Sequence, residues 1–145
     1  FFWISNTEQS PILTSSPKTY TMGSFLGDRL TERTLVVFWA TWCENCKEDL
    51  TELKELSQNS NDKGFSVVAI NADKPDLIEE AEKIWAQTGF QKEFISDAKG
   101  VWLNQLSIDA LPTYFLFNKA GEAILRFDGQ VDWKDEKILR IIFDS

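Results

Sequence analysis

The chain has 145 residues, 43% of them hydrophobic, and a formal net charge of −8 at pH 7. This length and apolar content predict a single globular domain with a packed core and argue against intrinsic disorder. Proteins that bind phosphate backbones present a face rich in Lys and Arg, so the acidic balance argues against nucleic acid as a partner.

The first 18 residues differ in composition from the rest of the chain. Four apolar residues, 1–4, precede a polar stretch over residues 5–18 that contains Ser, Thr and Pro. This order is typical of the remnant of a signal or anchor segment followed by a linker. We therefore predict a separate segment over residues 1–18 and a domain over residues 19–145. The alternatives are that residues 1–4 pack on the domain or do not belong to the natural chain.

The first half of the domain is expected to contain a strand followed by a helix. The nearly continuous apolar run of residues 34–40 predicts a strand that is covered on both faces. Leucines recur at helical spacing over residues 48–56 without Pro or Gly, so a helix is expected there. Before the strand, we expect a short edge strand over residues 19–22 and a turn or short helix over residues 23–33.

The second half predicts further strands that alternate with helices. Strands are expected at residues 65–70, 93–96, 113–117 and 122–127, and helices at residues 77–88, 100–107 and 133–143. Strand–helix–strand order implies parallel pairing with right-handed crossovers. Gly121 closes a predicted hairpin turn between the last two strands. The expected architecture is one α/β domain.

Cys43 and Cys46 stand where the first buried strand gives way to a helix. Unpaired N–H groups and the positive end of the helix dipole favour a thiolate at that point. The second sulfur lies one turn further on, so the pair can cycle between dithiol and disulfide. A zinc site would need carboxylate ligands, because the chain has no His and no further Cys. The pair could also be two idle buried thiols, or a structural disulfide, which would remove little unfolded-state entropy across so short a loop.

The sequence around these cysteines resembles the active-site signature of the thioredoxin superfamily. Residues 38–47 carry it as Phe-Trp-Ala-Thr-Trp-Cys-Glu-Asn-Cys-Lys, which is most similar to the membrane-anchored TlpA/ResA-like branch. Residues 108–117 resemble the segment with the family's cis-proline, here Pro112. The long interval before Pro112 fits an extra strand–helix insertion of this branch within residues 71–107. The resemblance implies a thioredoxin-like α/β fold with a central mixed β-sheet flanked by helices.

The resemblance also implies roles for residues near the cysteines. Cys43 would be the attacking nucleophile, and Cys46 would resolve the mixed disulfide. Glu44 places a negative charge beside Cys43, which disfavours the thiolate and raises the pKa of the thiol. The helix dipole acts in the opposite direction. The effect of Glu44 favours a reductant. Lys47 would help to hold the thiolate, or is a solvated surface lysine. Asp49 matches a recurring Glu of the branch and would take the Cys46 proton if partly buried; otherwise it is a surface aspartate.

Two positions depart from the family pattern. The buried acid that thioredoxins carry on the strand before the motif would fall at Val37, so that role is vacant. The proline within the active-site helix would fall at Thr51, which removes the usual cause of a kink there.

Substrate contacts are expected on three segments. Trp42, next to the first cysteine, would form a wall of the docking surface. Leu111 would offer its backbone to an extended substrate segment, and a cis bond before Pro112 would keep that edge open and exclude a metal from the sulfurs. Gly129, near the end of the return strand, is expected to lie on a third contacting loop, with a turn that makes no contact as the alternative.

The implied function is a thiol:disulfide oxidoreductase that reduces disulfides of protein substrates, for which cytochrome c apoprotein thiols are one candidate. It would work in the periplasm or another extracytoplasmic compartment, membrane-anchored in the full-length protein and supplied by a membrane thiol electron donor. We expect a monomer whose redox-active disulfide serves without a cofactor or metal. The alternatives are a dithiol oxidase or isomerase and a non-catalytic chaperone module that binds thiols or a soft metal such as Cu(I).

Overall fold

The computed structural model describes residues 2–5, 11–13 and 17–144. Within these residues the strands are β1 (Phe2–Ser5), β2 (Pro11–Leu13), β3 (Arg33–Trp39), β4 (Phe65–Asn71), β5 (Ile95–Ser96), β6 (Thr113–Asn118) and β7 (Ala123–Asp128). The α-helices are α1 (Pro17–Leu26), α2 (Cys46–Asn59), α3 (Ile78–Thr88), α4 (Val101–Gln105) and α5 (Glu136–Phe143). Short 3-10 turns are η1 (Gly27–Arg29), η2 (Asn61–Lys63) and η3 (Pro75–Leu77).

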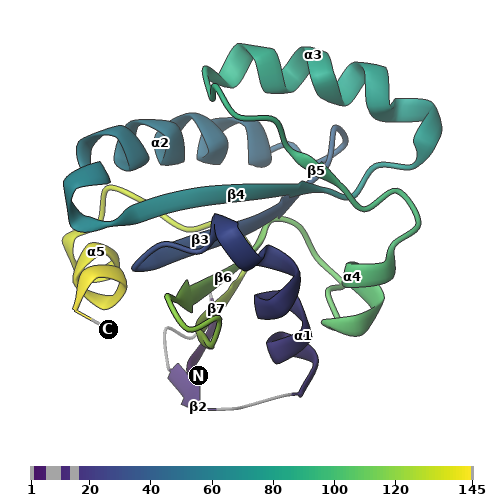
Figure 1. Ribbon diagram of the computed structural model, residues 1–145. Helices are drawn as coiled ribbons and strands as arrows, with labels where there is room; N and C mark the ends of the chain where they lie inside the picture. The colour runs from purple at the N-terminus through teal and green to yellow at the C-terminus, as the bar shows by residue number, and fades with distance from the viewer. Residues whose placement is uncertain (1, 6–10, 14–16, 145) are drawn as a thin grey trace.

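The strands form one mixed sheet in the order β2-β1-β7-β6-β3-β4-β5. Strand β3 lies inside the sheet, where it pairs in parallel with β4 and antiparallel with β6. Helices α2 and α3 cover one face of the sheet, and α1 and α4 lie on the other (Figure 1). The predicted α/β fold, with a central mixed sheet flanked by helices, is confirmed.

Strand β3 has apolar side chains on both faces, as its sequence predicts. Leu35 and Val37 pack with Leu50 of α2 in one core cluster. Val36 and Phe38 pack in a second cluster with residues of α1 and α4. All four β3 side chains are at most 1% exposed. Burial on both faces fixes the end of β3, and with it the start of the loop that carries the cysteines.

The edge strand predicted over residues 19–22 is wrong, because these residues lie in helix α1. Met22 and Leu26 are one helical turn apart and are both fully buried against the sheet. Tertiary burial of this helical face overrides the local pattern. Gly23 permits the close approach, since a Cβ there would collide with the carbonyl oxygen of Gly121 in the β6–β7 turn.

The predicted strand–helix insertion is present between β4 and β6 and consists of η3, α3, β5 and α4. The strand predicted at residues 93–96 is confined to β5, which pairs only with Ile70 and Asn71 of β4. The helix predicted at residues 100–107 is likewise shorter and forms only as α4.

Two aspartates explain where helices begin. The Asp97 carboxylate accepts the backbone N–H groups of Trp102 (3.1 Å) and Leu103 (3.1 Å), which starts α4. The Asp135 side chain caps α5 by accepting the N–H of Lys137 at 2.8 Å, so this helix starts at Glu136 rather than at residue 133. Helix α2 runs unbroken over its 14 residues, in keeping with the absence of the family's proline from its interior.

The N-terminal segment contributes backbone to the sheet. Strand β1 pairs in parallel with β7, and β2 pairs antiparallel with β1. Residues 1, 6–10 and 14–16 of the predicted remnant and linker lie outside the described residues, so the division of the chain at residue 18 stays a prediction. Among the described residues, none of the helices has both the length and the apolar character needed to cross a bilayer.

Candidate active site

The two cysteines are joined in a disulfide where β3 leads into α2. Their Cα atoms are 5.5 Å apart. The N–H of Cys43 donates to the carbonyl of Ala40 at 3.2 Å, and the N–H of Cys46 donates to the carbonyl of Cys43 at 3.3 Å. These bonds fold the loop between strand and helix into consecutive turns that bring the two sulfurs together.

The two sulfurs differ in accessibility. Cys43 is partly exposed, whereas Cys46, the first residue of α2, is 1% exposed and lies within the core cluster under this helix. An external disulfide can therefore reach Cys43, and Cys46 is shielded from it. This asymmetry is what a nucleophile and an internal resolving thiol require.

A buried carboxylate lies one turn beyond Cys46. Asp49 is 1% exposed. Its oxygens accept a hydrogen bond from the hydroxyl of Tyr114 at 2.6 Å and one from the side-chain amide of Gln130 at 3.4 Å. Burial raises the pKa of Asp49 to about 6, with a smaller contribution from the like charge of Glu52. Asp49 is thus no surface residue, and its pKa lies near neutrality, where a carboxylate is suited to exchanging protons with a thiol.

Tyr114 extends this network into the sheet. It lies on β6 opposite Val37 of β3, and its ring packs edge-on against Trp133 at a centroid distance of 4.9 Å. Burial and the adjacent Asp49 carboxylate raise the pKa of Tyr114 well above its ordinary value. The phenol therefore remains a proton donor to Asp49.

The predicted substrate-contact residues occupy three segments. Trp42 is 64% exposed beside the disulfide. The Leu111–Pro112 peptide bond is cis, and the next residue, Thr113, pairs with Phe38 near the end of β3. The N–H of Gly129 donates to the carbonyl of Pro112 at 2.8 Å. The structure therefore joins the Gly129 loop to the cis-proline segment.

Glu44 and Lys47 are both exposed. Neither forms an ion pair in the part of the chain that the structure describes. Their predicted opposite effects on a Cys43 thiolate stay predictions, because both cysteines are in the disulfide form. Among the described residues no group of three or more His, Cys, Asp or Glu side chains is arranged to hold a metal ion.

Three further residues support the site and are not predicted from the sequence: Tyr114, Asp73 and Arg126. Tyr114 belongs to an apolar strand and gives no sign of its partner. Asp73, after β4, hydrogen-bonds to Thr41 in the loop before the disulfide. Arg126 of β7 donates to the carbonyls of Leu106 and Ser107, ahead of the cis-proline segment. Each of these polar residues lies within or just after an apolar strand, which is the sign that the sequence offers. That position does not identify the residue with which the side chain forms a hydrogen bond.

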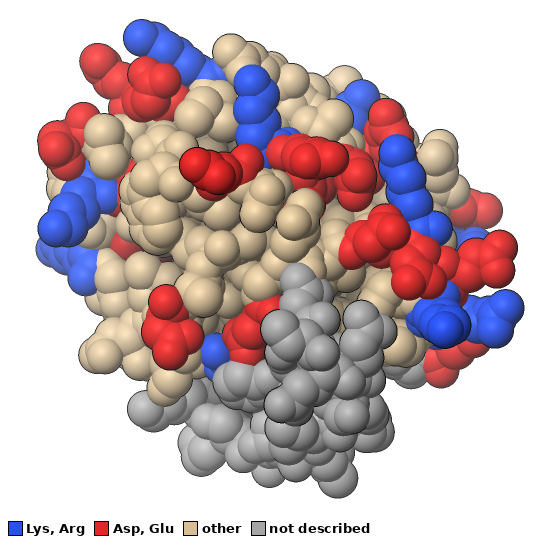
Figure 2. Space-filling model, turned by 180° about the vertical axis from the view of Figure 1, so that it is seen from behind, with Lys and Arg blue, Asp and Glu red and all other residues tan. Residues whose placement is uncertain are grey.

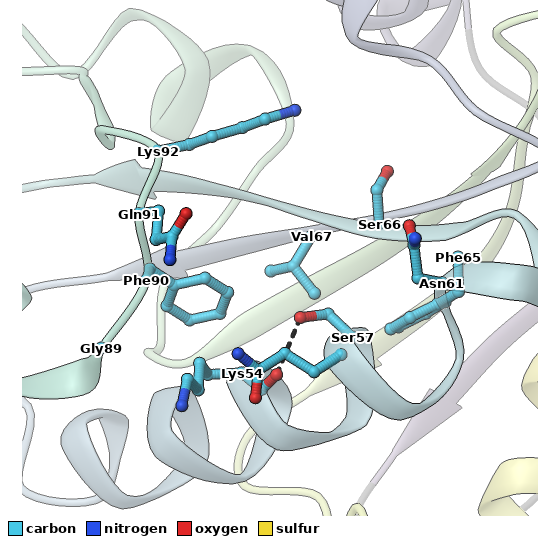
Figure 3. A pocket seen from close by; sticks show the side chains of 11 residues that line it. Lys54, Ser57, Asn61, Phe65, Ser66, Val67, Gly89, Phe90, Gln91 and Lys92 are labelled. Atoms are coloured by element: carbon cyan, nitrogen blue, oxygen red, sulfur yellow. Dashed lines mark hydrogen bonds between the residues drawn. The ribbon is translucent and has the colours of Figure 1, made fainter.

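A cavity of about 510 Å³ lies at the other end of α2 (Figure 3). It is lined by Lys54, Ser57 and Gln58 of the second half of this helix, by the start of β4 and by the loop of residues 89–92. None of its lining residues belongs to the disulfide, Asp49 or cis-proline segments. It is therefore separate from the candidate active site.

Comparison with known proteins relates the chain to thiol-disulfide oxidoreductases. The model of the Redoxin family matches residues 9–141. The chain is 32% identical over 85 residues to the thiol-disulfide oxidoreductase ResA of Geobacillus kaustophilus (59% of this chain, 48% of the relative). It is 28% identical over 93 residues to ResA of Bacillus thuringiensis (64% and 53%). The chain thus spans about half the length of these curated relatives.

The fold has solved counterparts. A putative thiol:disulfide interchange protein DsbE from Chlorobium tepidum superposes with a TM-score of 0.73 at 24% identity, over 99% of this chain and 91% of that one. StoA from Bacillus subtilis superposes with a TM-score of 0.59 at 22% identity, over 70% and 77%. On its family match over residues 9–141, the chain belongs to the Redoxin family, and its cysteine motif and fold are similar to those of the TlpA/ResA-like branch of the thioredoxin superfamily.

Proposed function

We propose that this chain is a thiol:disulfide oxidoreductase that reduces disulfides of protein substrates. The observation that carries the proposal is the disulfide between a partly exposed Cys43 and a buried Cys46 at the start of α2. The ResA relatives support this chemistry. The protein substrates, the reducing direction and the extracytoplasmic location are our proposals for this chain.

The reaction starts from the dithiol form. The Cys43 thiolate attacks one sulfur of the substrate disulfide, which forms a mixed disulfide and releases the first substrate thiolate. The Cys46 thiolate then attacks the sulfur of Cys43, which forms the Cys43–Cys46 disulfide and releases the second substrate thiolate. The substrate gains two electrons, and the protein loses two.

Asp49 is the proton acceptor for Cys46 in this scheme. Its pKa of about 6 leaves it ionised at pH 7 while the disulfide is present, yet close enough to neutrality to be protonated by a thiol. The Tyr114 and Gln130 donors hold the carboxylate in place during the transfer. Trp42, Leu111, Pro112 and Gly129 form the surface on which the substrate segment docks.

The dithiol must be regenerated by an external thiol donor. We propose a membrane thiol carrier at an extracytoplasmic location, because the relatives that share this motif are ResA proteins. The acidic Glu44 beside Cys43 favours the reducing direction. Equilibration with glutathione tests the direction: a potential near that of thioredoxin, about −270 mV, supports reduction, and one near about −120 mV supports a dithiol oxidase instead.

A trapping experiment tests the division of labour between the two cysteines. In Cys46→Ser the mixed disulfide on Cys43 cannot be resolved, so a peptide that contains one disulfide should accumulate as a covalent adduct visible by mass spectrometry. The matched control, Cys43→Ser, should form on the order of 10²-fold less adduct because Cys46 is buried. Equal trapping by the two variants would contradict the proposed roles.

A further inference from the structure

The carboxyl ends of β3 and β4 meet beside the loop that leads to Cys43, and a fully buried carboxylate lies between them. Asp73 has an exposed fraction of 0%. One of its oxygens accepts the backbone N–H of Thr41 at 2.9 Å, and the other accepts the Thr41 hydroxyl at 2.8 Å. The Asn71 side-chain amide also donates to Asp73 at 2.8 Å. These bonds connect the end of β4 to the residue two positions before Cys43.

Backbone bonds hold the same junction from both sides of Thr41. The N–H of Ala72 donates to the carbonyl of Trp39 at 2.8 Å, and the N–H of Cys43 donates to the carbonyl of Ala40 at 3.2 Å. The N–H of Asp73 in turn donates to the Asn71 side-chain oxygen at 3.0 Å. The turn that carries Cys43 is therefore held to the sheet by these backbone bonds and, through side chains, by Asp73.

The donors to the Asp73 carboxylate among the residues that the structure describes are Thr41 and Asn71, and both are neutral. The ion pairs found among the described residues are Arg126–Asp128 and Arg140–Glu136, and neither involves Asp73. Hydrogen bonds satisfy both oxygens of this buried carboxylate. A charge inside the protein is screened less than a charge in water, so Asp73 can act on a thiolate that the same turn carries.

We propose that Asp73 is a positioning residue for the redox pair: it fixes the turn of residues 41–43, and its negative charge disfavours the Cys43 thiolate. Disfavouring the thiolate destabilises the reduced form and makes the protein a stronger reductant. This inference rests on the proposed function and deepens it, because it assigns part of the reducing direction to a buried residue outside the cysteine motif.

The charge is tested by Asp73→Asn, which keeps a hydrogen-bond acceptor for Thr41 but removes the negative charge. We expect the acid dissociation constant of the Cys43 thiol to rise about three- to tenfold, and the equilibrium constant with glutathione to shift towards the reduced protein by a similar factor. A tenfold shift corresponds to about 30 mV in potential. The pH dependence of Cys43 alkylation by iodoacetamide measures the first quantity.

Thr41→Val distinguishes an effect of the Asp73 charge on Cys43 from an effect of a less ordered turn. It removes the hydroxyl donor and leaves the Asp73 charge less compensated, so the Cys43 acid dissociation constant should fall. Loosening alone would move both variants in the same direction. Asp76→Asn is the matched control, because Asp76 is an exposed acid three residues further along and its loss should leave both constants unchanged. The exposed charges nearest Cys43 in sequence, Glu44 and Lys47, stay the same in every variant.

The outcomes are distinct. Opposite shifts in Asp73→Asn and Thr41→Val, with no shift in Asp76→Asn, support the inference. Shifts of the same sign, or none, in variants whose near-ultraviolet circular dichroism is native overturn it. If Asp73→Asn does not fold, the sign of the Thr41→Val shift decides alone: a fall supports the inference, and a rise or no change overturns it. Failure of the wild-type protein to exchange with glutathione would instead reject the proposed function itself.

Discussion

Burial distinguishes Asp49 from the other acidic residues of α2. Glu48, its neighbour, is exposed, whereas Asp49 is 1% exposed and hydrogen-bonded to Tyr114. Its folded-state pKa of about 6 lies above the ordinary value of 3.8. The folded protein therefore binds this proton more tightly than the unfolded chain, and the stability that the protonated form provides is lost as pH rises from about 4 to about 6.

Asp49→Asn should consequently stabilise the disulfide form at pH 7. The shift sets an upper bound of about 3 kcal/mol, and we expect about 1–2 kcal/mol because hydrogen bonds are rearranged. The gain in stability that the wild-type protein shows between pH 7 and pH 5 should shrink in the variant. Urea unfolding at both pH values measures this. Glu48→Gln, an exposed change in the same turn, should alter neither value by more than about 0.5 kcal/mol.

The same substitution should slow catalysis. An amide cannot accept the Cys46 proton, so resolution of the mixed disulfide at pH 7 should fall on the order of 10²-fold. Stopped-flow detection of release of the second substrate thiol measures this step. A variant that is more stable but resolves at the wild-type rate would remove Asp49 from the mechanism and leave it a structural residue.

At the scale of elements, Arg126 connects β7 to the segment that precedes the cis-proline. It is buried and donates to the carbonyls of Leu106 at 2.7 Å and Ser107 at 3.1 Å. It also pairs with Asp128 at 3.1 Å. Since Ser107 has a φ of +53°, these bonds hold the chain at an unfavourable backbone angle before it enters β6.

Arg126→Met should destabilise the protein by about 3 kcal/mol, because it removes the guanidinium from the partly buried Asp128 carboxylate and leaves two carbonyls without their donor. Hydrogen exchange should become faster in residues 106–111, and KM for a peptide substrate should rise. Arg140→Met is the matched control: Arg140 pairs with Glu136 on the exposed surface of α5, so its loss should cost less than about 0.5 kcal/mol. An equal loss in the free energy of unfolding for the two substitutions would contradict the supporting role of Arg126.

The bounds of helices and strands show how much of the fold short stretches of sequence predict. Strand β3 was predicted almost to the residue, because continuous apolar character is characteristic of a strand buried on both faces. A strand was predicted over residues 19–22, which belong to helix α1, because so short a segment cannot reveal that Met22 and Leu26 are buried on one face of a helix. Helix α5 was predicted three residues too long at its start, which the Asp135 cap determines.

At the scale of the whole molecule, the net charge of −8 affects which substrates approach fastest. Figure 2 shows Asp and Glu side chains distributed among Lys and Arg side chains on the face opposite to that of Figure 1. Reduction of a cationic peptide disulfide should therefore slow several-fold as salt rises from about 10 mM to about 500 mM, because salt screens long-range attraction. The same peptide with Lys replaced by Gln should show little change. Equal slowing of the two peptides would contradict electrostatic steering.

The sequence by itself determined the redox pair, the cis-proline segment, the insertion between them and the fold class, because each is encoded in neighbouring residues. Only the tertiary structure decided that Asp49 is buried against Tyr114, that Asp73 fastens the turn before Cys43, and that Arg126 supports the segment before Pro112. These contacts join residues between 20 and 65 positions apart. Local patterns cannot specify such pairs, because whether a polar side chain is buried, and beside which partner, depends on how the strands are ordered in the sheet.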